Sequence, residues 1–363
     1  MENAIRYGLK SILVFLVGFI IIVWPVYFIQ TLGYPPEKQL LDTVAMSSSF
    51  NNSNKIVGLA RDSVVWASDK PVIRGAGHYA LGLMMVFQRA TGGNKIYFRG
   101  NVGDEGGKLY FPIVYFAKEP LGWWLLVVIA LIFTLYQLSK NRFKSVNWDS
   151  WARKYFLELS MLIWLALYWY TSISSNLNIG VRHILPVFPF SIMLVAGQLD
   201  RLKNYIESKK LKKIFYGVVI ASLSWLIFAN ISIWPYYLTY FNSAIGGPEK
   251  GYKIAVDSNL DWGQDLKRLE DWVKNKNIDI IELDYFGWAD QNYYLRGKWA
   301  PVHSNTYSNL EDFKNENKTD GWIAISATFL MNSIGDPNEG YWWLREIEPE
   351  IRIGNSIFVY HIK

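Results

Sequence analysis

The chain has 363 residues, of which 51% are hydrophobic and 17% aromatic, and its formal net charge is +6. It has no cysteine, which excludes disulfide frameworks, thiolate catalysis and cysteine-ligated metal sites. The basic residues gather in short segments between apolar runs, a distribution that indicates membrane topology rather than nucleic-acid binding. We therefore expect a polytopic α-helical membrane protein.

Five apolar runs are candidate membrane spans, because about 20 apolar residues cross the hydrocarbon core of a bilayer. They cover approximately residues 11–29, 121–138, 155–173, 184–199 and 214–236. The first run follows Arg6 and Lys10, as a secretory signal would. It is longer than the core of such a signal, and no small-x-small cleavage site follows it, which favours a membrane span.

The segment 30–118 between the first two runs is mixed and polar, and we expect a long irregular loop there. Within it, residues 76–87 form an apolar stretch that is too short to span a bilayer. This length favours a re-entrant helix or a helix that lies in the membrane interface.

The charges of the connecting segments predict the topology. Lysine and arginine concentrate before residue 11, at 139–154 and at 200–213, and cytoplasmic loops carry such an excess. With strict alternation of five spans, the N-terminus lies inside. The 30–118 loop, the 174–182 loop and everything after residue 240 then lie outside.

We expect two domains, a membrane domain over 1–240 and an extracytoplasmic soluble α/β domain over 241–363. In the second domain, an amphipathic helix is predicted over 261–275, with Asp261 as its N-cap. A hairpin is predicted over 351–362, turning at Gly354 and Asn355. The strands predicted before that hairpin cover residues 253–256, 278–286 and 321–330.

Arg182 and His183 lie side by side at the outer edge of the fourth apolar run. Charged groups at the mouth of a membrane segment are costly unless they meet water, a partner or an anion. The ordinary alternative is a cation that extends toward lipid headgroups. Because the positive-inside bias disfavours arginine on the outer face, we favour a phosphate-binding role for Arg182, with His183 as a weaker candidate.

Lys118, Glu119 and Pro120 begin the second run from the same outer side. Lys118 is a candidate second phosphate ligand, and Glu119 a candidate partner or acid–base group. The alternative is an interfacial ion pair, with Pro120 in the first turn of the following helix.

The remaining candidates carry weaker signals. His78 is a candidate site-lining residue, although a packed histidine is the more common case. Asp104 and Glu105, flanked by glycines, are more typical of a solvated turn than of a catalytic pair. The acids between 257 and 265 fail the spacing of a calcium loop. We expect no metal and no cofactor.

Four segments together resemble a known family: GHYALG (77–82), YFPIVYFAKEPLG (110–122), NIGVRHILPVFPF (178–190) and the block 237–269. They are similar to bacterial polyprenyl-phosphate-dependent glycosyltransferases. These are GT-C-fold relatives of the dolichyl-phosphate-mannose protein mannosyltransferases. The resemblance implies a GT-C-like fold in the bacterial cytoplasmic membrane, a polyprenyl-phosphate-linked sugar as donor and transfer on the outer face. It also implies that Arg182, Lys118 and His183 bind the donor phosphate.

The chain departs from this family where the catalytic acid belongs. Members place an aspartate, often in an Asp-Glu pair, just after their first span, whereas residues 30–46 here read QTLGYPPEKQLLDTVAM. The chain thus resembles the C-terminal half of such an enzyme, and a second polypeptide supplying the N-terminal half is an expected partner. The catalytic residue is left unassigned. The acids to test in the 30–118 segment are Asp42, Asp62, Asp69 and Asp104.

Two alternatives from other classes stay open. The first is a non-catalytic membrane subunit that binds a lipid phosphate and whose outer domain binds a partner or a glycan. The second is a transporter, which five spans without an internal repeat support less well.

Overall fold

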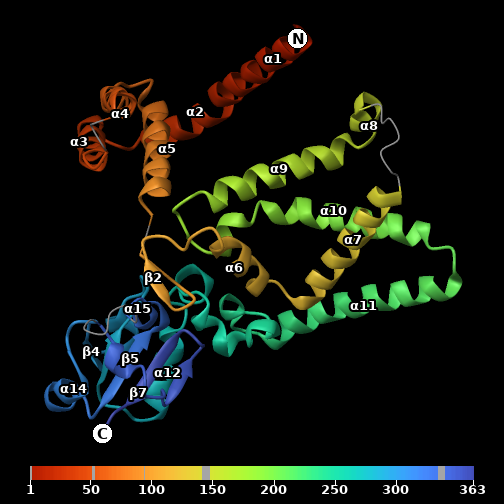
Figure 1. Cartoon of the computed structure of the whole chain (residues 1–363). Coiled ribbons are helices and arrows are strands. Elements are labelled where there is room, and N and C mark those ends of the chain that lie inside the picture. Colours follow the sequence, from red (N-terminus) through yellow and green to blue (C-terminus); the bar gives the residue numbers. More distant parts are fainter. Residues whose placement is uncertain (1, 51–53, 94, 141–147, 334–339) are drawn as a thin grey trace. The chain divides into compact units, whose positions relative to one another are not determined.

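The computed structural model describes residues 2–50, 54–93, 95–140, 148–333 and 340–363, and it divides into two compact units, Met1–Gly92 and Gly93–Lys363 (Figure 1). The predicted domain boundary at 240/241 lies inside the second unit. That unit holds both the later apolar helices and the C-terminal sheet.

The N-terminal unit is helical throughout most of its described length. Its elements are α1 (Glu2–Gly18), the π-helical turn η1 (Phe19–Val23), α2 (Trp24–Thr31), α3 (Pro36–Ser47), α4 (Lys55–Ala67) and α5 (Arg74–Gly92). The expectation of an irregular loop after residue 30 is therefore wrong for this part of the chain. The apolar stretch 76–87 is helical, as predicted, but it belongs to the longer helix α5.

Two features fix α5 against α2. The backbones of α5 and α2 approach each other closely at Gly75, where a Cβ would lie 2.7 Å from the backbone nitrogen of Phe28. Glycine therefore permits this contact. Arg74 is buried and donates to the carbonyl oxygens of Thr31 and Tyr34. The bond to Thr31 satisfies a carbonyl at the C-terminal end of α2, where helix carbonyls have no partner within the helix.

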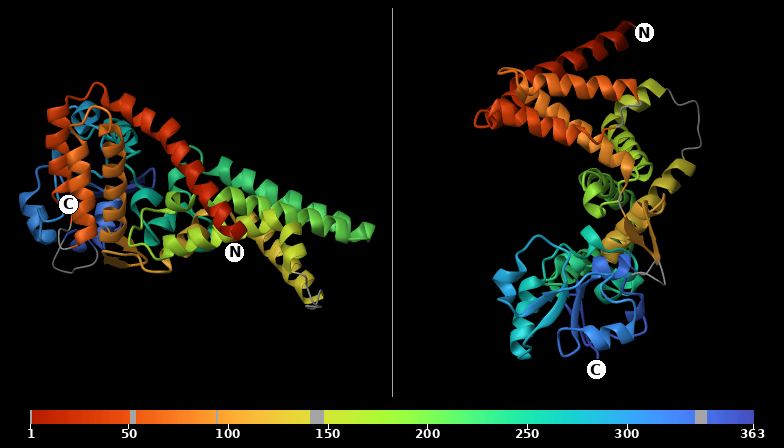
Figure 2. Two further views of the ribbon diagram at one scale, coloured as in Figure 1. Left: turned by 90° about the horizontal axis from the view of Figure 1, so that it is seen from above. Right: turned by 90° about the vertical axis from the view of Figure 1, so that its left-hand side faces the viewer.

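The second unit begins with a small hairpin and continues with long helices (Figure 1). Its first elements are β1 (Ile96–Phe98), β2 (Asn101–Gly103), α6 (Tyr110–Lys118), α7 (Leu121–Lys140), α8 (Trp148–Lys154), α9 (Phe156–Ile173), the 3₁₀ turn η2 (Val181–Ile184), α10 (Val187–Tyr205) and α11 (Lys209–Ser232). Helix α7 packs on both α10 and α11, and α10 also packs on α9 (Figure 2). At Gly122 a Cβ would lie 2.4 Å from the carbonyl oxygen of Ser222, so glycine permits the close contact of α7 with α11.

Among the described residues, four helices are long and apolar enough to cross a membrane. They are Ile5–Thr31, Leu121–Lys140, Phe156–Ile173 and Lys209–Ser232. Many of their large apolar side chains are exposed, as lipid-facing side chains would be. The predicted fourth run, 184–199, is not among them, because α10 carries Asp200, Arg201 and Lys203 in its last turns.

The C-terminal part is a five-stranded sheet with the strand order β4-β3-β5-β7-β6. Strand β3 is parallel to both β4 and β5, whereas β7 is antiparallel to β5 and β6. The strands are β3 (Ile281–Asp284), β4 (Trp299–Pro301), β5 (Trp322–Ser326), β6 (Ile351–Ile353) and β7 (Ile357–His361). The helices and 3₁₀ turns of this part are η3 (Tyr237–Thr239), η4 (Ser243–Ile245), η5 (Pro248–Lys253), η6 (Asp257–Asn259), α12 (Leu266–Asn275), α13 (Gln291–Leu295), α14 (Leu310–Glu316), α15 (Ala327–Asn332) and η7 (Trp342–Leu344).

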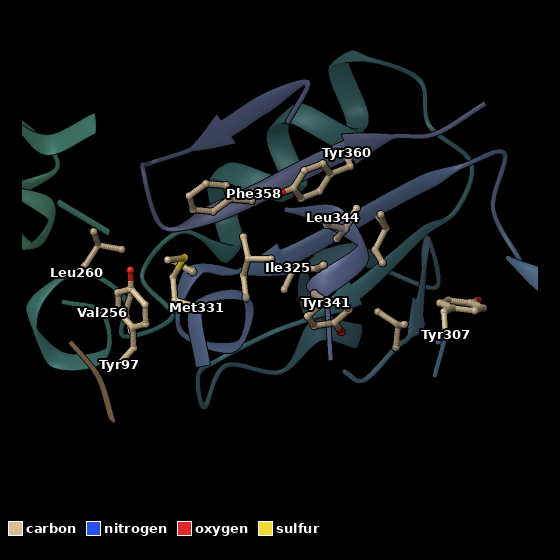
Figure 3. Packing of buried hydrophobic residues seen from close by; sticks show 14 of the residues in the cluster. Tyr97, Val256, Leu260, Tyr307, Ile325, Met331, Tyr341, Leu344, Phe358 and Tyr360 are labelled. Carbon is tan, nitrogen blue, oxygen red and sulfur yellow. The ribbon is translucent and has the colours of Figure 1, made fainter. Parts of the chain in front are cut away.

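Both faces of the sheet are covered. Leu266, Leu269 and Val273 of α12 pack on one face, as the helical spacing of the sequence predicts. The other face carries a larger core that includes Ile325, Tyr341 and Phe358 together with Tyr97 from the hairpin (Figure 3). This shared core explains why the hairpin and the sheet belong to one compact unit.

The predicted strands and turns have mixed outcomes. The hairpin over 351–362 is confirmed, with Gly354, Asn355 and Ser356 between the paired residues Ile353 and Ile357. Gly354 and Asn355 have φ values of +60° and +66°, which glycine and asparagine adopt more readily than other residues. The strand predicted over 278–286 is confirmed at its centre, as β3. The strand predicted over 321–330 is confirmed only in its first half, as β5, because α15 begins at Ala327. The strand predicted at 253–256 is wrong, because the chain there follows a 3₁₀ turn and forms an isolated bridge from Ala255 to Phe98.

Candidate functional site

The loop that carries Arg182 approaches the segment 257–262 closely. Gly180 precedes the turn η2 and has a φ of +87°, which glycine adopts without steric cost. A Cβ at Gly180 would lie 2.8 Å from Oδ1 of Asn259. Glycine at this position therefore allows both the positive φ and the close contact with Asn259.

Asn259 joins three parts of the second unit. It is fully buried, its Oδ1 accepts a hydrogen bond from the amide of Val181 (3.0 Å), and its Nδ2 donates to the hydroxyl of Tyr110 (2.9 Å). Its carbonyl oxygen accepts from Nζ of Lys118 (2.7 Å). A buried amide with these partners avoids the cost of unsatisfied polar groups and fixes the Arg182 loop against α6.

The guanidinium of Arg182 lies 4.4 Å from the ring centroid of Trp262. Its Nε donates to the carbonyl oxygen of Ile179 (3.0 Å), and in the part of the chain that the structure describes its two terminal nitrogens donate no hydrogen bond. Such a fork matches the oxygens of a phosphate or carboxylate in geometry and charge. The Trp262 ring and the Nε hydrogen bond thus orient a guanidinium whose terminal nitrogens have no hydrogen-bond partner among the described residues.

Asp257 adds a carboxyl group beside Arg182. Its amide donates to Oγ1 of Thr328 (3.0 Å), and its Oδ1 accepts from the hydroxyl of Ser258 (3.2 Å). Burial raises the pKa of Asp257, and the Ser258 hydrogen bond and the charge of Arg182 act in the opposite direction. A carboxylate with a raised pKa accepts a proton more readily near neutral pH, as a general base must.

His183 stacks on Phe111, with ring centroids 5.3 Å apart and an interplanar angle of 28°. Its backbone carbonyl accepts from the hydroxyl of Tyr168 (2.8 Å). Burial lowers the pKa of His183, and the neighbouring charge of Arg182 lowers it further. The lowered pKa favours the neutral imidazole, which has one N–H to donate.

Lys118 serves the fold directly. Its Nζ donates to the carbonyl oxygens of Leu238 and Asn259, both at 2.7 Å, and lies 4.5 Å from the ring centroid of Phe241. Burial lowers the pKa of Lys118, and the charge of Glu119 opposes this. Among the described residues, the hydrogen bonds to Leu238 and Asn259 use two of the three ammonium protons. The predicted phosphate-binding role of Lys118 stays a prediction.

Glu119 lines a cavity of about 310 Å³ together with Lys118, Asn230, Tyr237 and Tyr240. Burial raises the pKa of Glu119, and the charge of Lys118 opposes this. Among the described ion pairs, none within 4.0 Å joins Lys118 to Glu119. The interfacial ion pair offered as the alternative explanation is thus not formed, whereas Pro120 does directly precede α7.

His78 lies on α5 in the N-terminal unit. Its ring centroid is 6.2 Å from that of Tyr27 and 6.5 Å from that of Tyr34, and its buried Nδ1 has no partner among the described residues. Its predicted role as a site-lining residue stays a prediction. Three acids of the same unit contact neighbouring side chains: Asp42 contacts Tyr34, Asp62 contacts Arg61 and Asp69 contacts Lys70.

Asp261 does not cap α12, which begins at Leu266. It is fully buried instead, where Oδ2 accepts from the amide of Thr328 (3.1 Å) and Oδ1 from the amide of Gly263 (3.3 Å). Burial raises the pKa of Asp261 to about 7. The predicted N-cap is therefore wrong, and the carboxyl group joins the 257–265 segment to α15.

We expect Asp261→Asn to flatten the pH dependence of stability between about pH 4 and pH 7. The folded state binds the Asp261 proton more tightly than the unfolded state, whose pKa is near 3.8, so the wild-type free energy of unfolding falls as the pH rises through this window. In the variant, the slope of the free energy of unfolding against pH should be smaller by up to about 1.4 kcal/mol per pH unit. Chemical unfolding of the whole chain in detergent, from pH 4 to 8, measures it.

The matched control is Asp271→Asn, which changes an exposed aspartate of α12. It should retain the wild-type slope. Equal slopes for wild type and Asp261→Asn would contradict the raised pKa of Asp261.

The sequence located Arg182 and His183, and the structure adds Asp257, Asn259, Trp262 and Tyr110 around them. Three of these four residues, Asp257, Asn259 and Trp262, lie in the dense polar segment 257–265, which was the sequence feature that could have indicated them. Comparison with known proteins gives no match to a family model, a curated protein or a solved structure.

Proposed function

We propose that this chain is a membrane glycosyltransferase, or the C-terminal half of one, and that it holds a polyprenyl-phosphate-linked sugar donor at Arg182. The observation that carries the proposal is the guanidinium fork of Arg182, oriented by Trp262 and Ile179 and without a hydrogen-bond partner at its terminal nitrogens among the described residues. The resemblance of the segments around 110–122, 178–190 and 237–269 supplies the class of donor.

The proposed reaction transfers the sugar to an acceptor hydroxyl. The hydroxyl oxygen bonds to the anomeric carbon, the bond from that carbon to the phosphate oxygen breaks, and the polyprenyl phosphate leaves with the electron pair. Arg182 stabilises the charge that develops on the phosphate, because an oriented cation needs no reorganisation during the reaction. His183 supplies a neutral N–H donor beside it.

The acceptor proton requires a base. Asp257 is a candidate within this chain, since it interacts with Arg182 and has a raised pKa. The other candidate source is an aspartate from a second polypeptide that supplies the N-terminal half. The two sources predict different requirements for activity.

Side-chain contacts support a membrane arrangement in which α10 crosses beside the neighbouring apolar helices. Lys140, at the end of α7, donates to the hydroxyl of Tyr205 at the end of α10, and Arg201 pairs with Glu158 at the start of α9. Lys140 and Arg201 thus lie at one end of these helices, and the Arg182 loop lies at the other. With the basic end inside, Arg182 and the C-terminal sheet lie outside.

Transfer of radiolabelled sugar from polyprenyl-phosphate donors tests the proposal, using the purified full chain with and without the product of any adjacent upstream gene. Activity of the chain alone, lost in Asp257→Asn, would assign the base to this chain. Activity that requires the second polypeptide would assign it to that partner. Lipid binding without transfer in either preparation would instead indicate a non-catalytic lipid-phosphate-binding subunit.

A further inference from the structure

A cavity of about 650 Å³ lies in the second unit, and its described lining includes neither Arg182 nor the residues that contact Arg182. It opens at the carboxyl ends of the parallel strands β3 and β4, where Asp284 ends β3 and His303 follows β4. Lys95 and Asp104, which flank the hairpin β1–β2, line it as well. In open α/β sheets, ligands bind in the crevice outside the carboxyl ends of parallel strands.

Strand β3 places acids where a sheet interior usually carries apolar side chains. Ile281 and Leu283 pack with α12 on one face, whereas Glu282 and Asp284 alternate with them toward the other face. Asp284 is 7% exposed, and its Oδ2 accepts from the hydroxyl of Tyr341 at 2.7 Å. A buried carboxylate is costly to retain for stability alone, so its position at the cavity points to a ligand.

The second oxygen of Asp284 lies 3.8 Å from Nδ1 of His303, whose side chain is 77% exposed. Asn332 of α15 also lines the cavity, and its buried Oδ1 has no hydrogen-bond partner among the described residues. The ring of Phe329 adds an apolar surface held edge-on by Phe286, with ring centroids 5.4 Å apart. The cavity thus combines convergent acceptors and donors with one aromatic ring.

We propose that this cavity binds a saccharide. Each sugar hydroxyl both donates and accepts, which suits a lining with two carboxylates, an ammonium and an imidazole. The carboxylates disfavour a phosphate or another anionic ligand, and the polar lining disfavours a purely apolar one. The aromatic ring offers a surface for the apolar face of a sugar ring, and the volume lies in the range of small-molecule sites, about 300–1,000 Å³.

This binding needs neither a lipid-linked donor nor transfer, so it goes beyond the proposed function. Direct binding of maltotriose, mannotriose and chitotriose to the full chain in lipid nanodiscs tests it, measured by saturation-transfer-difference NMR. We expect at least one of them to bind. His303→Ala and Asp104→Asn should each weaken that binding about tenfold, the loss expected for one hydrogen bond to a charged or polar group.

Both substitutions are at exposed positions, so neither should impair folding. Asp284→Asn retains an acceptor for Tyr341 while it removes the charge, and it should weaken binding at least as much. The matched control is Asp271→Asn, an exposed aspartate on α12 outside the cavity, which should bind as wild type does.

Absence of binding by all three saccharides at millimolar concentration would overturn the proposal, and so would binding that the cavity variants leave unchanged. Binding of the diamine putrescine in place of the saccharides would overturn it too, because two carboxylates would then serve a cation. Arg182→Ala should leave saccharide binding intact. The experiment therefore distinguishes failure of the saccharide proposal from failure of the proposed donor site at Arg182.

Discussion

Replacing Arg182 by alanine is expected to weaken binding of a polyprenyl-phosphate sugar by about 1.5–3 kcal/mol, or roughly ten- to 150-fold. The substitution removes a charge-assisted fork that Trp262 and Ile179 already orient. Because the terminal nitrogens have no partner among the described residues, the loss should appear in binding rather than in folding. Titration of the donor lipid into the full chain in nanodiscs measures it.

Arg345→Ala is the matched control for this experiment. Arg345 also lies over a tryptophan, 4.1 Å from the ring centroid of Trp342, and it pairs with Glu346. The same change of residue there should leave donor affinity unchanged. If Arg182→Ala folds and binds the donor as tightly as Arg345→Ala does, Arg182 is not part of the donor site.

Lys118→Ala is expected to lower the free energy of unfolding by about 3 kcal/mol, since hydrogen bonds to charged groups contribute roughly 1.5–3 kcal/mol. The substitution removes the donor that two carbonyl oxygens share, those of Leu238 and Asn259. Asn259 also holds the Arg182 loop through Val181, so that loop should loosen as well. Thermal unfolding of the purified chain in detergent measures the loss.

Lys267→Ala is a suitable control, because Lys267 is exposed on α12 and the change should cost little. A Lys118 variant as stable as the Lys267 variant would contradict the structural role. If that variant also bound the donor lipid more weakly, Lys118 would be a phosphate ligand, as the sequence predicts.

The long apolar runs were predictable because span length and composition are local properties. Four of the five predicted runs correspond to helices long and apolar enough to cross a membrane within the described residues. The remaining run, 184–199, differs because helix α10 begins only at Val187 and continues past the apolar run through Asp200, Arg201 and Lys203. Composition shows where the apolar run stops, but it does not show where the helix stops.

The segment after residue 30 was misjudged for a related reason. Its polar composition and its turn-forming residues predict a loop, yet α3, α4 and α5 form there. The stability of these helices depends on tertiary contacts, such as the hydrogen bonds that buried Arg74 donates at the end of α2. Such contacts override the weak helix propensity of the local sequence, so composition alone does not predict the helices.

In the C-terminal part, the hairpin turn at Gly354 and Asn355 has a strong local signal, and it is confirmed. The strand order β4-β3-β5-β7-β6 could not be predicted, because it depends on pairing between segments far apart in the chain. The same holds for the candidate site. Tyr110, Asn259 and Trp262 meet Arg182 and its loop only through such long-range contacts.

The central claim is that the chain recognises the phosphate of a lipid-linked sugar. The most direct measurement compares the affinity of the full chain for a polyprenyl-phosphate sugar with its affinity for the same polyprenyl glycoside lacking the phosphate. Because the guanidinium fork of Arg182 has no hydrogen-bond partner at its terminal nitrogens among the described residues, we expect at least about tenfold tighter binding of the phosphate lipid. We expect Arg182→Ala to abolish the difference. Equal affinity for the two lipids would contradict the account.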